Sequence, residues 1–131
     1  NVDGAVGKSS GDGGGGGVFR DHHGAFCGAL AHLFPHVSRP DVAELLACRK
    51  ALQVGQELNI QRLHVEMDSK EAVCMINDAR KNLSMVGTIV EDIKSLMRCW
   101  QDCKVTWRRR SANKAAHTLA RLAVGDGVCM V

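Results

Sequence analysis

The stretch LHVEMDS at residues 63–69 decides the expected fold, because it has the pattern of a strand that ends on an acidic residue. Its apolar residues, at positions 63, 65 and 67, alternate with polar ones, as the two faces of a strand do. The pair Asp68 and Ser69 then fits the start of a helix, since a side-chain oxygen at that position accepts a hydrogen bond from the first turn. We therefore expect a strand at 63–68 and a short helix that runs to about residue 77.

Two further acidic residues precede this strand, each in a short motif of its own. Asp3 lies in VDGA, within an expected strand at 1–6, and Glu44 lies in AELLA, within an expected helix. Carboxylates in this order on a strand–helix–strand frame indicate a site that holds divalent metal against phosphate. Each residue also has a purely structural interpretation: Asp3 as a turn residue, Glu44 as a solvated helix residue and Asp68 as a helix cap.

The first third of the chain has the pattern of β-structure. A glycine run at 11–17 precedes an apolar stretch at 25–33, and the turn signal HHG lies between them. We expect the glycine run to be flexible at its start and to open the first of two adjacent strands, which a tight turn joins. No Gly-Lys-Ser/Thr follows the glycines, so we interpret the run as a loop or strand-edge segment rather than a phosphate loop.

The rest of the chain combines helices with one more strand. A helix is expected at 40–54 with Gly55 at its end, since glycine commonly terminates helices. Apolar residues at i, i+3, i+4 and i+7 predict a long helix at 84–100, followed by a strand at 103–107 and a last helix at 112–124. This order of elements predicts an α/β fold with a mixed five-stranded sheet flanked by helices.

Length and composition describe one ordinary globular domain. The 131 residues are 45% hydrophobic and 24% charged, and the formal net charge of +3 permits a polyanionic partner without requiring one. No apolar run approaches the roughly 20 residues that a membrane helix needs. We expect a single domain over 1–131, with 125–131 as a tail, that acts as a monomer away from membranes. Because the chain starts at Asn1 without a signal-like segment, we interpret it as a fragment of a longer polypeptide.

The six cysteines are scattered at irregular spacings and form no zinc pattern. An α/β domain of this size needs no disulfides, so we expect the cysteines to be reduced and structural, with Cys48 and Cys74 among the apolar residues of helices. Reduced cysteines indicate an intracellular protein. The compartment stays open.

Several short motifs occur along the chain in a characteristic order. They are VDGA at 2–5, GVFRDHHG at 17–24, AELLA at 43–47, EMDS at 66–69, IVEDI at 89–93, and RR at 109–110 leading to NKAAHTLA at 113–120. In this order they resemble the ribonuclease H-like fold, and most closely its plant reverse-transcriptase-like branch. Domains of that branch are common at the end of retroelement-type polyproteins and as small stand-alone proteins. The resemblance covers about residues 1–124.

The resemblance implies a hydrolase, an endonuclease that cuts the RNA strand of an RNA–DNA hybrid. It implies that Asp3 bridges two divalent ions and that Glu44 and Asp68 complete much of the site, with Mg²⁺ or Mn²⁺ suited to these oxygen ligands. In such sites the ions lie about 4 Å apart, activate a water and stabilise the departing 3′ oxygen. A 3′–5′ exonuclease of similar fold is disfavoured, because its Asp-x-Glu pair is absent from the first strand.

The family's fourth carboxylate is replaced here by His117, in the motif AHTLA. Three interpretations stay open. His117 ligates a metal and gives a manganese-favouring enzyme, since imidazole is a poorer partner for Mg²⁺. Alternatively, His117 is a bystander and three acids suffice. In the third interpretation the domain is catalytically impaired and binds nucleic acid or a protein without cutting.

A basic run, RRR at 108–110, follows the last strand. Arg109 and Arg110 are candidates for contact with nucleic-acid phosphates, with a solvated basic loop as the alternative. Asn113 either contacts substrate or metal or caps the last helix, and Trp107 is expected in the core. The expected nucleic-acid partner is an RNA–DNA hybrid, recognised by backbone shape and 2′-hydroxyls rather than by sequence.

Overall fold

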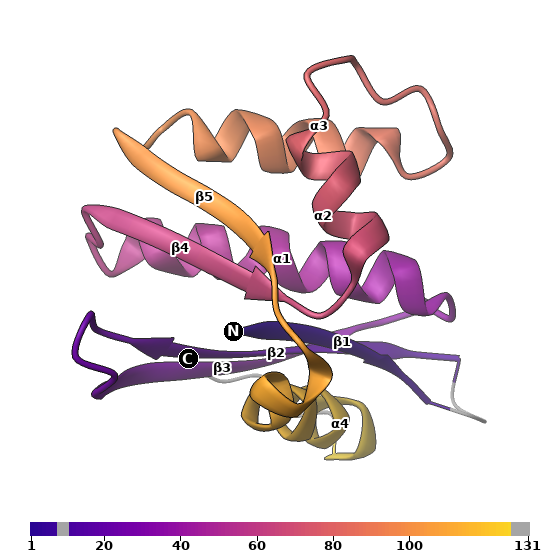
Figure 1. The fold of residues 1–131 in the computed structure, drawn as a ribbon. Coiled ribbons are helices and arrows are strands. Elements are labelled where there is room, and N and C mark those ends of the chain that lie inside the picture. The colour runs from indigo at the N-terminus through magenta and orange to yellow at the C-terminus, as the bar shows by residue number, and fades with distance from the viewer. Residues whose placement is uncertain (8–10, 127–131) are drawn as a thin grey trace.

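The computed structural model describes residues 1–7 and 11–126 and contains a five-stranded sheet in the order β3-β2-β1-β4-β5 (Figure 1). The strands are β1 (Val2–Val6), β2 (Gly13–Arg20), β3 (Phe26–Phe34), β4 (Arg62–Met67) and β5 (Asp102–Trp107). The first three strands pair antiparallel, whereas β4 pairs parallel with both β1 and β5. The sheet is therefore mixed, as the order of elements predicted.

Helices cover both faces of this sheet. They are α1 (Pro40–Glu57), α2 (Lys70–Asn77), α3 (Gly87–Met97) and α4 (Lys114–Asp126), with a short 3-10 helix, η1 (Arg110–Asn113), leading into α4. α1, α2 and α3 lie on one side, and α4 lies on the other side against β1, β2 and β3 (Figure 1). The α/β fold expected from the sequence is confirmed.

The main core lies between the sheet and the layer of α1, α2 and α3. Val65 and Met67 of β4 are buried in it, as the alternation in LHVEMDS predicts. Burying a side chain of this size stabilises the fold by roughly 1.5–3 kcal/mol. The largest fully buried apolar side chains are Leu30, Leu45, Leu52, Val54, Met67, Val90, Ile93 and Val105.

The glycine run forms most of β2, which lies in the interior of the sheet between β1 and β3. The expectation that the run opens a strand is confirmed, whereas its interpretation as a loop or strand-edge segment is wrong. Glycine is needed here because helices press on both faces of β2: a Cβ at Gly15 would lie 2.9 Å from Cβ of Ala47 in α1. The run is thus a close-packed strand rather than a flexible connection.

Helix ends differ from expectation where packing overrides local signals. α1 continues through Gly55 to Glu57, because Gly55 serves as a contact point for the side chains of Leu63 and Trp100 rather than as a terminator. The left-handed conformation after the helix is taken by Asn59, whose φ is 55°. α3 is shorter than predicted and spans Gly87–Met97. At the start of α2, Ser69 caps the helix by accepting a hydrogen bond from the Ala72 N–H, as predicted.

Among the residues that the structure describes, no helix combines the length and apolar character needed to cross a bilayer. Cys48 is buried in α1 as expected, but Cys74 is exposed, because it lies on the outer side of α2. The cysteines within residues 11–126 are free. α4 extends to Asp126, so the expected tail begins later than residue 125, and residues 127–131 with Cys129 lie outside the described part.

Candidate metal centre and nucleic-acid interface

Asp3 and Asp68 lie where two neighbouring strands separate. β1 and β4 pair at Val2 and Met67 only, and an acidic residue comes next in each chain segment. β4 ends at Met67, so Asp68 begins the turn into α2, whereas β1 continues alongside β2. This shared point of separation brings together two carboxylates that are far apart in the sequence.

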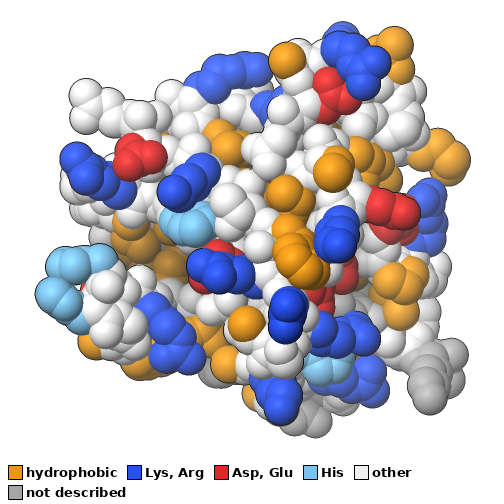
Figure 2. All heavy atoms as spheres, viewed as in Figure 1, with side chains coloured by type: hydrophobic (Ala, Val, Ile, Leu, Met, Phe, Trp, Pro, Cys, Tyr) orange, Lys and Arg blue, Asp and Glu red, His pale blue; other side chains and the backbone are white. Residues whose placement is uncertain are grey.

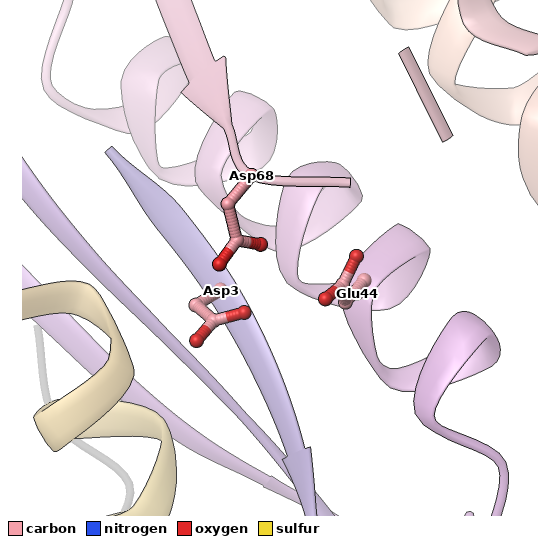
Figure 3. Close-up of side chains that lie close together, drawn as sticks. All are labelled: Asp3, Glu44 and Asp68. Atoms are coloured by element: carbon pink, nitrogen blue, oxygen red, sulfur yellow. The ribbon is translucent and has the colours of Figure 1, made fainter. Parts of the chain in front are cut away.

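Glu44 reaches the same place from α1, which lies very close to β1. Gly4 permits this approach, because a Cβ at position 4 would lie 2.4 Å from backbone atoms of Ala43 and Glu44. Figure 3 shows the side chains of Asp3, Glu44 and Asp68 gathered from β1, α1 and the end of β4. The three residues singled out in the sequence are thus neighbours in space.

The carboxylates form a tight cluster. Asp3, Glu44 and Asp68 each offer an oxygen, and these oxygens lie within 4.8 Å of one another. The Asp3 side chain is fully buried and that of Asp68 is 8% exposed. Burial, and then the negative charges of Asp68 and Asp3, raises the pKa of Glu44 to about 7. Burial and the charge of Asp3 also raise the pKa of Asp68.

This donor set fits a hard divalent cation. Clustered carboxylates repel one another, and a bound cation would remove that repulsion and lower both raised pKa values. Oxygen ligands are those that Mg²⁺ and Mn²⁺ prefer in proteins. The geometry therefore agrees with the kind of metal that the resemblance implied.

His117 and Arg110 border the cluster on the side of α4. His117 Nδ1 lies 2.7 Å from Asp3 Oδ2 in a hydrogen bond, and the backbone N–H of Gly4 donates to Asp3 Oδ1 at 2.9 Å. Arg110 Nε lies 3.5 Å from Asp68 Oδ2. The imidazole of His117 therefore lies beside Asp3, and the guanidinium of Arg110 lies beside Asp68.

A second glycine brings His117 into reach. Asp3 pairs with Gly16 across β1 and β2, and a Cβ at Gly16 would lie 2.3 Å from the carbonyl oxygen of Ala116 in α4. Without a side chain at position 16, α4 lies directly on β2, and its next residue, His117, lies beside Asp3. α1 and α4 thus supply site residues from opposite faces of the sheet.

Two side chains hold the backbone at the point where β1 and β4 separate. Asn113 Nδ2 donates to the Val2 carbonyl at 2.7 Å, and the Trp107 indole N–H donates to the Asp68 carbonyl at 3.2 Å. Carbonyls near a separating strand pair need partners outside the sheet, and these two side chains provide them.

The positions of Asn113 and Trp107 differ from the sequence-based expectations. Asn113 is 1% exposed and its Nδ2 contacts β1, so the structure shows a structural contact at this residue, while its buried Oδ1 has no hydrogen-bond partner among the described residues. Trp107 is 40% exposed rather than in the core, because it is the last residue of an edge strand, at the limit of the helical layer. The ammonium of Lys70 lies 4.4 Å from the centroid of its ring.

The basic run lies on the surface beside the cluster. Arg108 pairs with Glu66 of β4, whereas Arg109 is exposed and forms no ion pair within the described residues. Sequence reasoning missed the role of Gly4 and Gly16, although glycine inside an expected strand is a usable signal of a close backbone approach. It also missed Trp107 as a support for Asp68, for which the sequence holds no signal.

The family comparison covers nearly the whole chain. A family model described as reverse transcriptase-like matches residues 1–123. The chain belongs to this family. A search of curated proteins found no match for this reverse transcriptase-like domain.

Solved structures share the fold of the reverse transcriptase-like domain. Ribonuclease H1 from the archaeon Halobacterium salinarum is 20% identical, with a TM-score of 0.88 over 95% of each chain. LC11-RNase H1 in complex with an RNA/DNA hybrid is 20% identical, with a TM-score of 0.84 over 96% of this chain and 95% of that one. A foamy viral protease-reverse transcriptase in complex with dsDNA is 15% identical, with a TM-score of 0.77 over 95% of this chain and 92% of that one. The domain therefore has a ribonuclease H-like fold.

Proposed function

We propose that this domain is a divalent-metal-dependent endonuclease that hydrolyses the RNA strand of RNA–DNA hybrids. The observation that carries the proposal is the cluster of Asp3, Glu44 and Asp68, whose oxygens lie within 4.8 Å of one another on a ribonuclease H-like fold. Two neighbours of the same fold, a ribonuclease H1 bound to a hybrid and a reverse transcriptase bound to DNA, support a nucleic-acid partner.

The proposed metal ligands are Asp3, Glu44 and Asp68, holding Mg²⁺ or Mn²⁺ in a two-ion site. When bound, divalent cations lower the pKa of a water and stabilise negative charge on a phosphodiester and its leaving oxygen. The buried Asp3 is held in one orientation by the Gly4 N–H and by His117, so it is preorganised as a central ligand.

Arg109 and Arg110 have a separate proposed role, which is to contact phosphates of the nucleic acid. Arg110 lies beside Asp68 with 76% of its side chain exposed, and Arg109 is exposed next to it. Their guanidinium groups can donate to phosphate oxygens of a strand laid across the carboxylates, which would orient the strand without reading its bases. Asn113 is buried and would act on this surface only by holding η1 against β1.

The proposal extends to partner and assembly. A protein that recognises the shape of the nucleic-acid backbone needs no contacts to the bases. The 2′-hydroxyls distinguish the RNA strand from DNA. We propose a monomer as the working unit, because a single chain by itself brings the three acids and His117 together. The resemblance to the plant, retroelement-type branch supports a parent protein of that kind.

One observation favours a second function, binding without hydrolysis. His117, which the resemblance places at the position of the family's fourth carboxylate, hydrogen-bonds to Asp3 Oδ2. That bond uses an oxygen of the central acid and adds no negative charge to the site. A domain of this kind could bind a hybrid and fail to cut it.

A strand-specific cleavage assay separates the two functions. A hybrid labelled on the RNA strand or on the DNA strand is incubated with Mn²⁺ or Mg²⁺ and with wild type or Asp68→Asn protein. Hydrolysis of the RNA strand alone, lost in Asp68→Asn, is the expected result, and a preference for Mn²⁺ would implicate His117. A folded wild type that binds the hybrid but leaves both strands intact in either metal would establish the binding module instead.

A further inference from the structure

A cavity lies next to the carboxylate cluster, between η1 and the first turns of α4. It measures about 540 Å³ and is lined by Arg110, Ser111, Lys114, His117 and Thr118. Two of these residues also contact the cluster: His117 through Asp3, and Arg110 through Asp68. The cavity and the carboxylates are therefore adjacent, with His117 and Arg110 forming the boundary.

The lining of the cavity suits an anion. Arg110 and Lys114 are cationic, and Ser111 carries a hydroxyl, whereas the Thr118 hydroxyl donates to the Lys114 carbonyl at 3.0 Å. None of the described residues that line the cavity is acidic. Lys114 is exposed and forms no ion pair within residues 1–7 and 11–126. In Figure 2, Lys, Arg and His side chains gather around α4 and the segment that leads to it, in the lower part of the view. A free ammonium beside a hydroxyl donor, here Ser111, is a combination that binds phosphate oxygens.

We propose that this cavity is a phosphate-binding pocket, in which Lys114, Ser111 and Arg110 hold a phosphate of the nucleic-acid strand next to the phosphodiester at Asp3 and Asp68. The proposal rests on the proposed function for the neighbouring site. It adds Lys114 and Ser111 as substrate-binding residues, neither of which belongs to the carboxylate cluster.

The opposite charges of the pocket and of the carboxylate cluster explain how such a pocket would act. The acidic cluster alone repels a polyanionic strand, whereas the pocket attracts it. A strand anchored in the pocket by one phosphate presents the next phosphate along the chain to the carboxylates, across the boundary formed by His117 and Arg110. Binding at the pocket thus sets the position of the strand, and hydrolysis stays with the acids.

Equilibrium binding of a fluorescent RNA–DNA hybrid, in a chelator so that no strand is cut, tests the proposal. Loss of one phosphate contact in Lys114→Ala is expected to lower the slope of log K against log salt by about 1 and to weaken binding about fivefold near 0.1 M salt. Lys114→Arg should restore both values. Lys50→Ala removes the same charge from α1, beside His32 of β3, and should match wild type. A wild-type slope in Lys114→Ala would overturn the proposal.

A second measurement separates the pocket from the proposed nuclease. Inorganic phosphate is titrated into isotope-labelled wild type, Lys114→Ala and Ser111→Ala, with backbone amide shifts as the readout. Saturable shifts at residues 111–118 in wild type, reduced in both variants, would support the pocket even if wild type neither binds nor cuts the hybrid. Absence of saturable shifts in folded wild type would overturn the pocket, whatever the cleavage assay shows.

Discussion

At the level of single residues, Glu44 shows how the carboxylate cluster lowers the stability of the folded protein. Its carboxyl is removed from water and placed beside the carboxylates of Asp68 and Asp3, and its pKa rises to about 7. The folded state therefore holds a proton over a pH range in which the unfolded chain, with a pKa near 4.5, has released it. This contribution to stability is complete below pH 4.5 and is lost as the pH rises through 7.

Glu44→Gln should therefore raise the melting temperature of the metal-free protein at pH 8. The amide keeps the shape of the side chain and removes the charge that burial and the two neighbouring aspartates disfavour. The fall in melting temperature between pH 5 and pH 8 should also be smaller in the variant. Thermal unfolding in a chelator across this range measures both effects.

The matched control for this prediction is Glu57→Gln, which removes an exposed carboxylate at the end of the same helix. It should follow the pH dependence of wild type. If Glu44→Gln melts at or below the wild-type temperature at pH 8 without metal, the repulsion assigned to Glu44 is wrong.

Asn113 is the second residue whose role follows from its contacts. Its Nδ2 is the donor for the Val2 carbonyl next to Asp3, and its side chain is buried. Asn113→Ala should reduce the free energy of unfolding by about 1–3 kcal/mol, because a buried carbonyl loses its partner. Urea unfolding measures the loss. An unchanged unfolding midpoint would show that η1 does not hold β1 at this point.

At the level of elements, the site depends on two helices that lie directly on strands. α1 meets β1 at Gly4, and α4 meets β2 at Gly16. Each contact lies next to a residue of the cluster: Gly4 follows Asp3 in the chain, and Gly16 pairs with Asp3 across the strands. The glycines thus set the distances from Asp3 to Glu44 and to His117.

Gly4→Ala tests this dependence. The added Cβ would lie 2.4 Å from backbone atoms of α1, so the helix must shift, at a cost of about 1–3 kcal/mol or more. Gly28→Ala in β3 is the control, since no atom lies within 4 Å of its added Cβ. Calorimetry with and without Mn²⁺ should show lower stability and weaker metal stabilisation for Gly4→Ala, and neither change for Gly28→Ala. Equal behaviour of the two variants would contradict the role of Gly4.

At the level of the whole molecule, the sequence predicted what local patterns encode. The alternation in LHVEMDS gave β4 and its buried face, and the order of elements gave the mixed sheet. The cluster of Asp3, Glu44 and Asp68 followed from motif order, and the structure brings these residues together. The metal and the reaction stay predictions.

What the sequence did not reveal depends on contacts between distant segments. Gly55 resembled a helix end, but in the folded chain it meets Trp100 and stays helical. Trp107 alternated like a core residue, but the helical layer does not cover the end of β5. The glycine run resembled a loop, but in the folded chain two helices pack so closely on it that there is no space for side chains. For Gly55 and Trp107, no local pattern contains such information.

The most direct test of the central claim, that Asp3, Glu44 and Asp68 form a divalent-cation site, is thermal unfolding with and without millimolar Mn²⁺ or Mg²⁺. Wild type should gain stability by mass action, about 2.7 kcal/mol at a hundredfold excess over the dissociation constant. Asp68→Asn should lose most of this gain, and Glu57→Gln should keep it. A folded wild type with no gain in either metal, or an Asp68→Asn variant with the full gain, would contradict the account.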